Sequence, residues 1–316
     1  MSQEKGWESP ICRLCESAGP IRWGWRYNSY GPKQRWRCRD CGRTFVVDDG
    51  FIGKRLPPDA ICAAWDLFFR GTSLEDISRH LKVCWSLDVT APAILEWARS
   101  YSRLLADWVE AVMTPKKVDG GRRWHQDIAV LKLGRENRYV WLMRGRGDNG
   151  RPMLLAVRYS RDRKERHAVA LLKDAIGRAE RLPDALVSDG EHSFERAYNI
   201  VLYQKHREVK LVHGVPIACK KHGLEHNNNP AEQMVDDLKD WYRHMNGLSS
   251  DRSAADLLRG WFVHEDFVDA HSRTMTWAER AGLNLGLPLE DRVQEMIKRA
   301  TRWRLENRKE FHQPRT

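Results

Sequence analysis

The chain has 316 residues, more than the usual single domain of about 100 to 200, so two or three folded units are expected. Lysine and arginine total 54 against 43 aspartate and glutamate residues, and the net charge of +11 favours a polyanionic partner bound through its phosphates. Nucleic acid is the first expectation, and a basic enzyme with a solvated Lys/Arg surface is the alternative that composition leaves open.

Neither a secretion signal nor a membrane span is expected. Residues 1–10 are polar, and no later stretch reaches the roughly 18 apolar residues that a membrane span needs. We therefore expect an intracellular protein without a membrane partner. In a reducing compartment its seven cysteines are expected to be metal ligands or buried thiols rather than disulfides.

Two CxxC pairs near the N-terminus indicate a metal site. Cys12 and Cys15 form the first pair, Cys38 and Cys41 form the second, and 22 residues lie between them, slightly beyond the usual interval. Each pair points two thiolates at one ion, so two pairs complete a closed four-thiolate sphere. A redox dithiol is the alternative, but it needs a strand-to-helix context that the neighbouring Gly, Pro and Trp do not supply. The prediction is a zinc ribbon over residues 1–55 with a structural Zn²⁺.

Basic and aromatic residues nearly alternate between the two pairs, which suits short strands. The basic ones, which extend into and just past the second pair, are Arg22, Arg26, Lys33, Arg35, Arg37, Arg39 and Arg43, and the aromatic ones are Trp23, Trp25, Tyr27, Tyr30 and Trp36. Guanidinium groups contact phosphates and flat rings stack on bases or sugars, so we predict that these basic residues bind DNA. A ribbon this small also needs aromatic residues as core, and the two roles are compatible.

Residues 56–117 are expected to form a small helical domain of the helix-turn-helix type. Three helices follow from apolar spacing and capping residues: one with Ile61, Ala64, Trp65 and Phe68, one capped by Thr72 or Ser73, and one from Pro92 with Ile94, Trp97, Tyr101 and Leu104 inward. The second turn, over residues 83–89, is longer than such motifs normally use. A plain helical hairpin is the alternative.

From about residue 118 the pattern changes to strands that alternate with helices. We expect antiparallel strands over 128–133, 139–143 and 153–157, a helix over 168–176, a strand over 185–187, a helix over 193–202, a strand over 208–212 and a helix from about 229 to 245. This is the element order of an α/β domain with an RNase H-like fold of the retroviral-integrase type, expected over residues 118–250. Residues 251–316 are expected to form a helical extension with a basic tail.

That fold requires three carboxylates at defined places. Asp127 is expected at the start of the first strand, Asp189 at the end of the fourth strand and Glu232 in the first turns of the final helix. Carboxylates suit hard cations such as Mg²⁺ or Mn²⁺, and two such ions activate the attacking oxygen and stabilise the leaving oxygen. We therefore predict these three acids as catalytic residues and magnesium ligands.

Several segments carry a resemblance to a known family. They are Cys38-Arg-Asp-Cys41-Gly-Arg-Thr-Phe45, Trp124-His-Gln-Asp127, Val187-Ser-Asp189-Gly190, Asn228-Asn-Pro-Ala-Glu232 with Met245-Asn-Gly-Leu248, and Trp277-Ala-Glu-Arg-Ala-Gly282. With them, nearly the whole chain resembles the DDE transposases of bacterial and archaeal insertion sequences, in the branch related to insertion sequence number six. The resemblance implies the same three catalytic acids, DNA as partner and a nucleoid-associated protein in the cytoplasm of a prokaryotic cell.

The sequence departs from that family at two places. Ile128 follows Asp127 where a glutamate is common, and the interval between Asp189 and Glu232 is longer than is typical. The extra residues fall around 205–225, where Glu225 is a rival third acid, and we prefer Glu232 for its Asn-Asn context. Whether catalysis is retained is therefore a separate question from ancestry.

One further group has the spacing of metal ligands. Cys219, His222 and His226 would form a second zinc site if a fourth ligand joined them. The alternative is a loop along the DNA path in which Cys219 is a small apolar filler.

Three functions follow from these patterns. The first is a transposase whose ribbon and helical unit bind the terminal repeats of an element, and whose acids cleave DNA and join it to target DNA. Pairing of two ends implies a homodimer. The second is a domesticated or inactive DNA-binding protein derived from a transposase, and the third is a hydrolytic nuclease that cuts without joining. The fold alone does not separate them.

Overall fold

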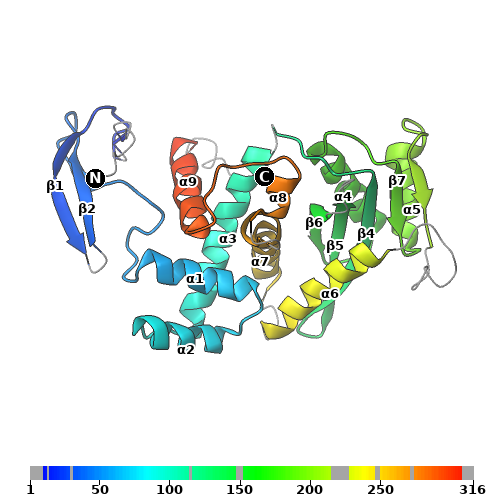
Figure 1. Ribbon diagram of the computed structural model, residues 1–316, viewed down its shortest axis with the longest axis horizontal. Coiled ribbons are helices and arrows are strands. Elements are labelled where there is room, and N and C mark those ends of the chain that lie inside the picture. The colour runs from blue at the N-terminus through cyan, green and yellow to red at the C-terminus, as the bar shows by residue number, and fades with distance from the viewer. Residues whose placement is uncertain are drawn as a thin grey trace.

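The computed structural model describes residues 10–307 except 13, 29–30, 114–115, 147–151, 215–227, 246–249 and 271–273. Three parts follow one another along an elongated molecule: a small N-terminal sheet, a group of helices, and a larger sheet with helices packed on it (Figure 1). Among the described residues, none of the helices has the length and apolar character that crossing a membrane requires.

The N-terminal sheet is a three-stranded antiparallel ribbon, as the alternating pattern predicts. Its strands pair in the order β1-β2-β3 and are β1 (Ile21–Asn28), β2 (Gly31–Arg37) and β3 (Thr44–Val46). A separate small core of Cys12, Trp36, Cys38 and Phe45 holds the ribbon together. A core of four side chains buries little apolar surface, so the ribbon needs a further source of stability.

Three helices follow, namely α1 (Pro58–Phe69), α2 (Leu74–Trp85) and α3 (Ala91–Met113). The predicted cap of the second helix is confirmed, because the Ser73 side chain accepts a hydrogen bond from the backbone N–H of Asp76. The expected long turn over residues 83–89 is shorter in the structure, because α2 continues to Trp85 and α3 begins at Ala91, which leaves five residues between the helices. Val83 is exposed but still helical, so the loss of apolar spacing there marks a solvent-facing turn of helix rather than its end. The helix ends at Ser86, which has φ +56°.

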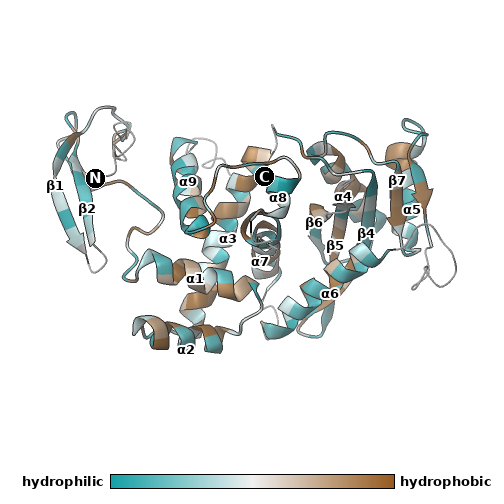
Figure 2. Cartoon of the chain, viewed as in Figure 1, coloured by the Kyte–Doolittle hydropathy of each residue, from teal (hydrophilic) through white to brown (hydrophobic). Residues whose placement is uncertain are grey.

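The larger sheet has five strands in the order β6-β5-β4-β7-β8. Its strands are β4 (Arg123–Leu133), β5 (Glu136–Arg146), β6 (Pro152–Ser160), β7 (Ala185–Ser188) and β8 (Lys210–Val212). The first three are antiparallel, whereas β7 runs parallel to β4 and β8 parallel to β7. This strand order and these directions are those of an RNase H-like fold, as predicted. The four residues of β7 are all buried, and Figure 2 shows this strand as hydrophobic.

The helices of this part are α4 (Glu165–Arg178), α5 (His192–Tyr198), which continues as the π-helical turn η1 (Asn199–Tyr203), and α6 (Asn229–His244). One expectation is wrong here. Asp127 does not begin its strand, because β4 already starts at Arg123. The strand's first half contains His125 and Gln126, two buried polar residues that hide it from an apolar pattern.

The C-terminal part is helical, with α7 (Asp251–Val263), the π-helical turn η3 (His264–Val268), α8 (Trp277–Arg280) and α9 (Arg292–Glu306). Helix α7 packs against α3 and β6, and α9 packs against α3 and α1 (Figure 1). One hydrophobic core therefore extends from α1 through the large sheet to α9. The expected domain boundaries after residues 117 and 250 stay predictions. The hydrophobic core is continuous across both positions, so packing does not mark a boundary at either.

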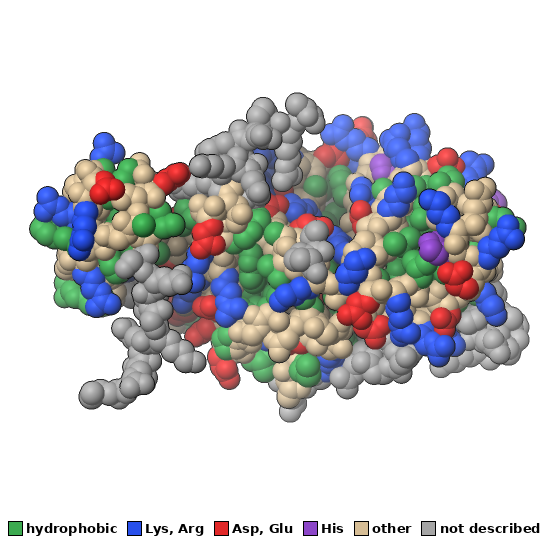
Figure 3. Space-filling model, turned by 90° about the horizontal axis from the view of Figure 1, so that it is seen from above, with side chains coloured by type: hydrophobic (Ala, Val, Ile, Leu, Met, Phe, Trp, Pro, Cys, Tyr) green, Lys and Arg blue, Asp and Glu red, His purple; other side chains and the backbone are tan. Residues whose placement is uncertain are grey.

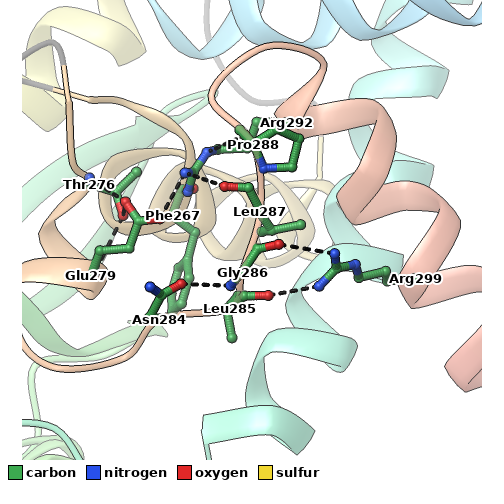
Figure 4. A network of polar contacts seen from close by, with 10 residues as sticks. All are labelled: Phe267, Thr276, Glu279, Asn284, Leu285, Gly286, Leu287, Pro288, Arg292 and Arg299. Carbon is green, nitrogen blue, oxygen red and sulfur yellow. Dashed lines mark hydrogen bonds and ion pairs between the residues drawn. The ribbon is translucent and has the colours of Figure 1, made fainter. Parts of the chain in front are cut away.

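Polar contacts around Arg292 and Arg299 organise the segment between α8 and α9 (Figure 4). The buried guanidinium of Arg292 pairs with the Glu279 carboxylate at 2.8 Å and donates to the carbonyl oxygens of Phe267, Leu287 and Pro288. Glu279 also closes a capping box with Thr276. Arg299, predicted as part of a basic tail, donates to the carbonyl oxygens of Leu285 and Gly286. It therefore has a structural role.

Candidate active site and zinc site

The three predicted acids come from three elements that meet at one edge of the large sheet. The parallel pairing of β4 with β7 ends at the pair Gln126 and Ser188, and Asp127 and Asp189 are the next residues on the two strands. Glu232 lies in the first turn of α6, which packs across β4 and β5. Residues far apart in the chain are thus carried toward one place by strand pairing and helix packing.

Helix α6 is fixed to the sheet near both of its ends. Three hydrogen bonds join them: the Asn228 side-chain amide to the Gln126 carbonyl oxygen at 3.4 Å, the Arg144 guanidinium to the Pro230 carbonyl oxygen at 3.2 Å, and the Tyr242 hydroxyl to the Lys132 carbonyl oxygen. Asn228 is 1% exposed, so its contact is protected from water. These anchors determine which way the first turn of α6, and with it Glu232, faces.

The electrostatics of Asp127 report that the acids are close together. Burial of this side chain and the negative charges of Asp189 and Glu232 raise its pKa to about 6. Two groups act in the opposite direction: the Ile128 backbone N–H, which donates to the Asp127 carboxylate at 2.6 Å, and the positive charge of Lys239. The site is therefore a partly buried concentration of negative charge.

This donor set fits divalent cations. Three carboxylates offer the hard oxygen ligands that Mg²⁺ and Mn²⁺ prefer, and a cation would relieve the repulsion that raises the pKa of Asp127. Among the described residues, two groups of side chains have all their ligand atoms within 4.8 Å of one another, and the three acids are not one of these groups. Their carboxylate oxygens are therefore more widely spaced.

Lys239 is a further candidate residue near the acids, and the sequence analysis missed it. It lies seven residues after Glu232 on α6, and residues at this spacing share one face of a helix. Its charge lowers the pKa of Asp127, which places the ammonium group within electrostatic range of the acids. The seven-residue spacing was the signal in the sequence that could have identified it.

The structure explains why Ile128 can follow Asp127 where a glutamate is common in the family that the sequence resembles. Successive side chains of a strand point to opposite faces, so Ile128 faces away from the side of β4 that carries Asp127. Its side chain is half-buried and packs against the main core. An isoleucine at this position therefore leaves the arrangement of the three acids intact. The rival acid Glu225 and the metal-like group Cys219, His222 and His226 lie outside the described residues.

The predicted zinc ligands are brought together in the ribbon. The sulfur atoms of Cys12 and Cys41 are 3.8 Å apart, those of Cys15 and Cys38 are 3.5 Å apart, and all four lie within 4.8 Å of one another. Backbone N–H groups of Cys41 and Asp40 lower the pKa of Cys38 to about 6, which favours a thiolate. Gly42, at φ +68°, lets the chain turn tightly after the second pair. Four thiolates in this arrangement fit a tetrahedral Zn²⁺, which would supply the stability that the small core lacks.

The ribbon also exposes an aromatic strand. Trp23, Trp25 and Tyr27 on β1 are 44%, 55% and 77% exposed, whereas Trp36 belongs to the core. The aromatic residues of β1 are therefore on the surface, and Trp36 is the one that packs in the core of the ribbon. Tyr30 lies outside the described residues.

The predicted DNA-binding cations of the ribbon differ in their surroundings. The Arg37 guanidinium stacks on the Trp23 ring at 4.5 Å, whereas the Lys33 ammonium is paired with Asp49 at 2.6 Å. Arg35 donates to the Thr44 hydroxyl. In the view of Figure 3, Lys and Arg side chains are scattered over the ribbon and over the part that contains the large sheet, among hydrophobic and acidic side chains. Lys33 is thus already neutralised, while Arg37 and its ring form an exposed cationic and aromatic surface.

Comparison with known proteins gives one match that bears on function. Residues 121–271 match a protein-family model (DDE_Tnp_IS240) described as a DDE domain, and this span contains all three acids. No curated protein matches the chain.

Two solved structures are similar at low identity. A simian T-cell lymphotropic virus intasome, in complex with PP2A regulatory subunit B56 gamma, is 14% identical, with a TM-score of 0.35, over 71% of this chain and 74% of that chain. The yeast mitochondrial Holliday junction resolvase Ydc2 is 8% identical, with a TM-score of 0.22, over 69% of this chain and 99% of that chain. Because these TM-scores are low, the fold assignment depends on the strand order and directions described above.

Proposed function

We propose that this chain, whose residues 121–271 match a DDE domain, is a transposase that binds the terminal repeats of an insertion sequence and catalyses strand cleavage and strand transfer there. The observation that supports this most strongly is the convergence of Asp127, Asp189 and Glu232, which follows from the parallel pairing of β4 with β7 and the packing of α6 across β4. Asp127 and Glu232 are half-buried and Asp189 is exposed, so a cation bound between them would relieve their mutual repulsion while one side of the site stays open to DNA.

Asp127, Asp189 and Glu232 would hold the divalent cations of the reaction. The chemistry that Mg²⁺ or Mn²⁺ would supply there is activation of the attacking oxygen and stabilisation of the leaving oxygen of a phosphodiester. Asp127 sits in the middle of β4, and the anchors of α6 keep Glu232 against the sheet, so both carboxylates have a rigid support. Lys239 offsets part of the negative charge and is suited to meet a phosphate of the DNA.

The proposed reaction consists of two substitution steps at phosphorus, a hydrolysis followed by a transesterification. In the first, water attacks the phosphodiester at the element end, and the bond to the 3′-oxygen breaks to leave a free 3′-hydroxyl. In the second, that hydroxyl attacks a phosphodiester of target DNA and forms a new bond while a target 3′-oxygen leaves. The enzyme forms no covalent intermediate, and pairing of two element ends calls for a homodimer.

Two N-terminal units would recognise the DNA. In the ribbon, Arg22, Arg26, Arg35, Arg37, Arg39 and Arg43 would contact phosphates while the exposed rings of β1 stack on sugars or bases. Lys33 would have to leave Asp49 to take part. In the helical unit, α2 presents Arg79 and Lys82, whose side chains are 73% and 69% exposed, and is the candidate for groove contact.

The test is strand cleavage and strand transfer on labelled duplexes that carry the ends of the element, in Mg²⁺ or Mn²⁺. Wild type should yield joined product, and Asp189→Ala and Glu232→Ala should each lose it while still binding the duplex. Asp240→Asn is the matched control, because this exposed α6 acid pairs with Arg243 at the far end of the helix.

Two results would overturn the proposal in different ways. Tight binding by wild type without metal-dependent cleavage would indicate a DNA-binding protein derived from a transposase. Cleavage without joined product would indicate a hydrolytic nuclease.

A further inference from the structure

A second group of metal-ligand side chains lies next to Asp189. His192, Glu195 and His213 each offer one ligand atom, and these atoms all lie within 4.8 Å of one another. The first two occupy positions i and i+3 of α5, and the third directly follows β8, the strand at the edge of the sheet beside β7. Three potential ligands, two from α5 and one from the end of β8, thus converge; Figure 1 shows α5 beside β7 at one end of the molecule.

One histidine of the group is already oriented by a buried neighbour. The Nδ1 atom of His213 lies 2.7 Å from the Ser188 hydroxyl, and Ser188 is fully buried at the end of β7. When Nδ1–H donates to that hydroxyl, the lone pair of Nε2 is free for a metal. Histidine ligands of metals commonly have such a partner on the other ring nitrogen, which sets the tautomer and the ring orientation.

The donor set distinguishes this group from the three acids. Two imidazoles and one carboxylate suit Zn²⁺ and other first-row transition ions, whereas three carboxylates suit Mg²⁺ or Mn²⁺. In a tetrahedral zinc site with bonds of about 2.1 Å, the ligand atoms are roughly 3.4 Å apart. His192 and Glu195 are exposed, so rotation of their side chains can close the remaining distance. A fourth position would remain open to water.

The group is tied to the loop that carries Asp189. That loop joins β7 to α5, and Ser188, which contacts His213, immediately precedes Asp189 in the chain. Gly190, at φ +105°, approaches the residue after His213 so closely that a Cβ atom on it would lie 3.2 Å from Gly214 Cα. A metal ion bound by residues of α5 and by His213 at the end of β8 would therefore connect the two sides of the loop that carries Asp189.

We propose that His192, Glu195 and His213 bind a first-row transition ion such as Zn²⁺, in a site separate from the three acids and from the ribbon. The ion links α5 to the end of β8 and restrains the loop that carries Asp189. Ser188 is a positioning residue for the His213 ligand. Metal binding at this site needs neither DNA nor cleavage, so its test is independent of the proposed function.

The experiment measures Zn²⁺ bound to the full chain after equilibrium dialysis, by elemental analysis. His192→Ala and His213→Ala should each bind one equivalent fewer than wild type, with Glu195→Gln as a milder variant. His206→Ala is the matched control, because this exposed histidine of the same region pairs with Glu208 outside the group. Ser188→Ala should weaken zinc binding about tenfold or more.

Cobalt distinguishes this site from the ribbon. Wild type should bind one more equivalent of Co²⁺ than His213→Ala. This additional Co²⁺ should lack the thiolate charge-transfer band that Co²⁺ shows at Cys12, Cys15, Cys38 and Cys41. Hydrogen exchange of residues 188–195 should slow on addition of Zn²⁺ in wild type and not in His213→Ala. Equal zinc content in wild type and both histidine variants would overturn the site, and binding without any change in exchange would overturn the restraint of the loop.

Discussion

Replacing Gly260 by alanine should destabilise the protein, although alanine is the better helix former. Gly260 lies in α7 where this helix crosses α3, and it has no side chain because the two backbones approach closely. A Cβ atom there would lie 2.5 Å from Ser102 Cβ and 2.6 Å from Phe69 Cζ, and closer still to Ser102 Oγ. All three distances are far below the roughly 3.5–4.0 Å of favourable carbon contacts.

The expected magnitude follows from two opposing effects. Overpacking of a core costs about 1–3 kcal/mol, and the upper end applies because the nearest atoms are close to the α3 backbone rather than at the end of a flexible side chain. Alanine recovers about 1 kcal/mol over glycine in a helix. The net loss in the free energy of unfolding should be about 2 kcal/mol.

The assay is urea denaturation of Gly260→Ala and of a matched control, Gly177→Ala. Gly177 lies in α4, and a Cβ atom there would meet nothing within 4 Å, so alanine should stabilise by about 0.5 kcal/mol. In a double-mutant cycle, Ser102→Gly should cost less in the Gly260→Ala background than in wild type, because it removes two of the three clashing atoms and leaves only Phe69 Cζ. Similar unfolding midpoints for the two alanine variants would refute the steric argument.

Three further predictions concern the zinc site, acid stability and the support of α6. Cys38→Ser should lose one zinc equivalent and weaken DNA binding, while circular dichroism of the helical part stays unchanged, since the ribbon has its own core. Hydrogen bonds from Arg138 and Tyr159 lower the pKa of Asp251 to about 2, below its unfolded value near 3.9. The stability from this carboxylate is therefore present above about pH 4 and lost as pH falls toward 2, and Asp251→Asn should remove that slope in acid unfolding curves. Asn228→Ala should reduce cleavage about tenfold, a loss of about 1.4 kcal/mol, with duplex binding unchanged, and equal rates would show that the Gln126 contact does not position Glu232.

Local patterns predicted much of this protein. The cap at Ser73, the short buried strand that ends before Asp189 and the start of α6 near Pro230 all depend on interactions within a few residues, and each was identified from the sequence. The spacing of the two CxxC pairs was likewise enough to predict a four-cysteine group, whose sulfur atoms the structure brings together. Element order then determined the RNase H-like topology, because few strand arrangements satisfy it.

Long-range contacts escaped the same patterns. The first half of β4 was missed because buried polar residues such as His125 and Gln126 interrupt the apolar signal, and their burial depends on the covering elements. Lys239 and the group around His213 depend on where α6 and α5 are placed relative to the sheet. The position of α7 between α3 and β6 has no local marker apart from Gly260.

One physical reason separates the features that the sequence predicted from those that it missed. Periodicity, capping and metal-ligand spacing act between residues close in the chain, so the sequence by itself determined the elements, the zinc ligands and the three candidate acids. How near Asp127, Asp189 and Glu232 come, and which other charges share their site, depends on packing between elements many residues apart. Only the tertiary structure decided that, because the pKa of Asp127 reflects the burial and the neighbouring charges that this packing creates.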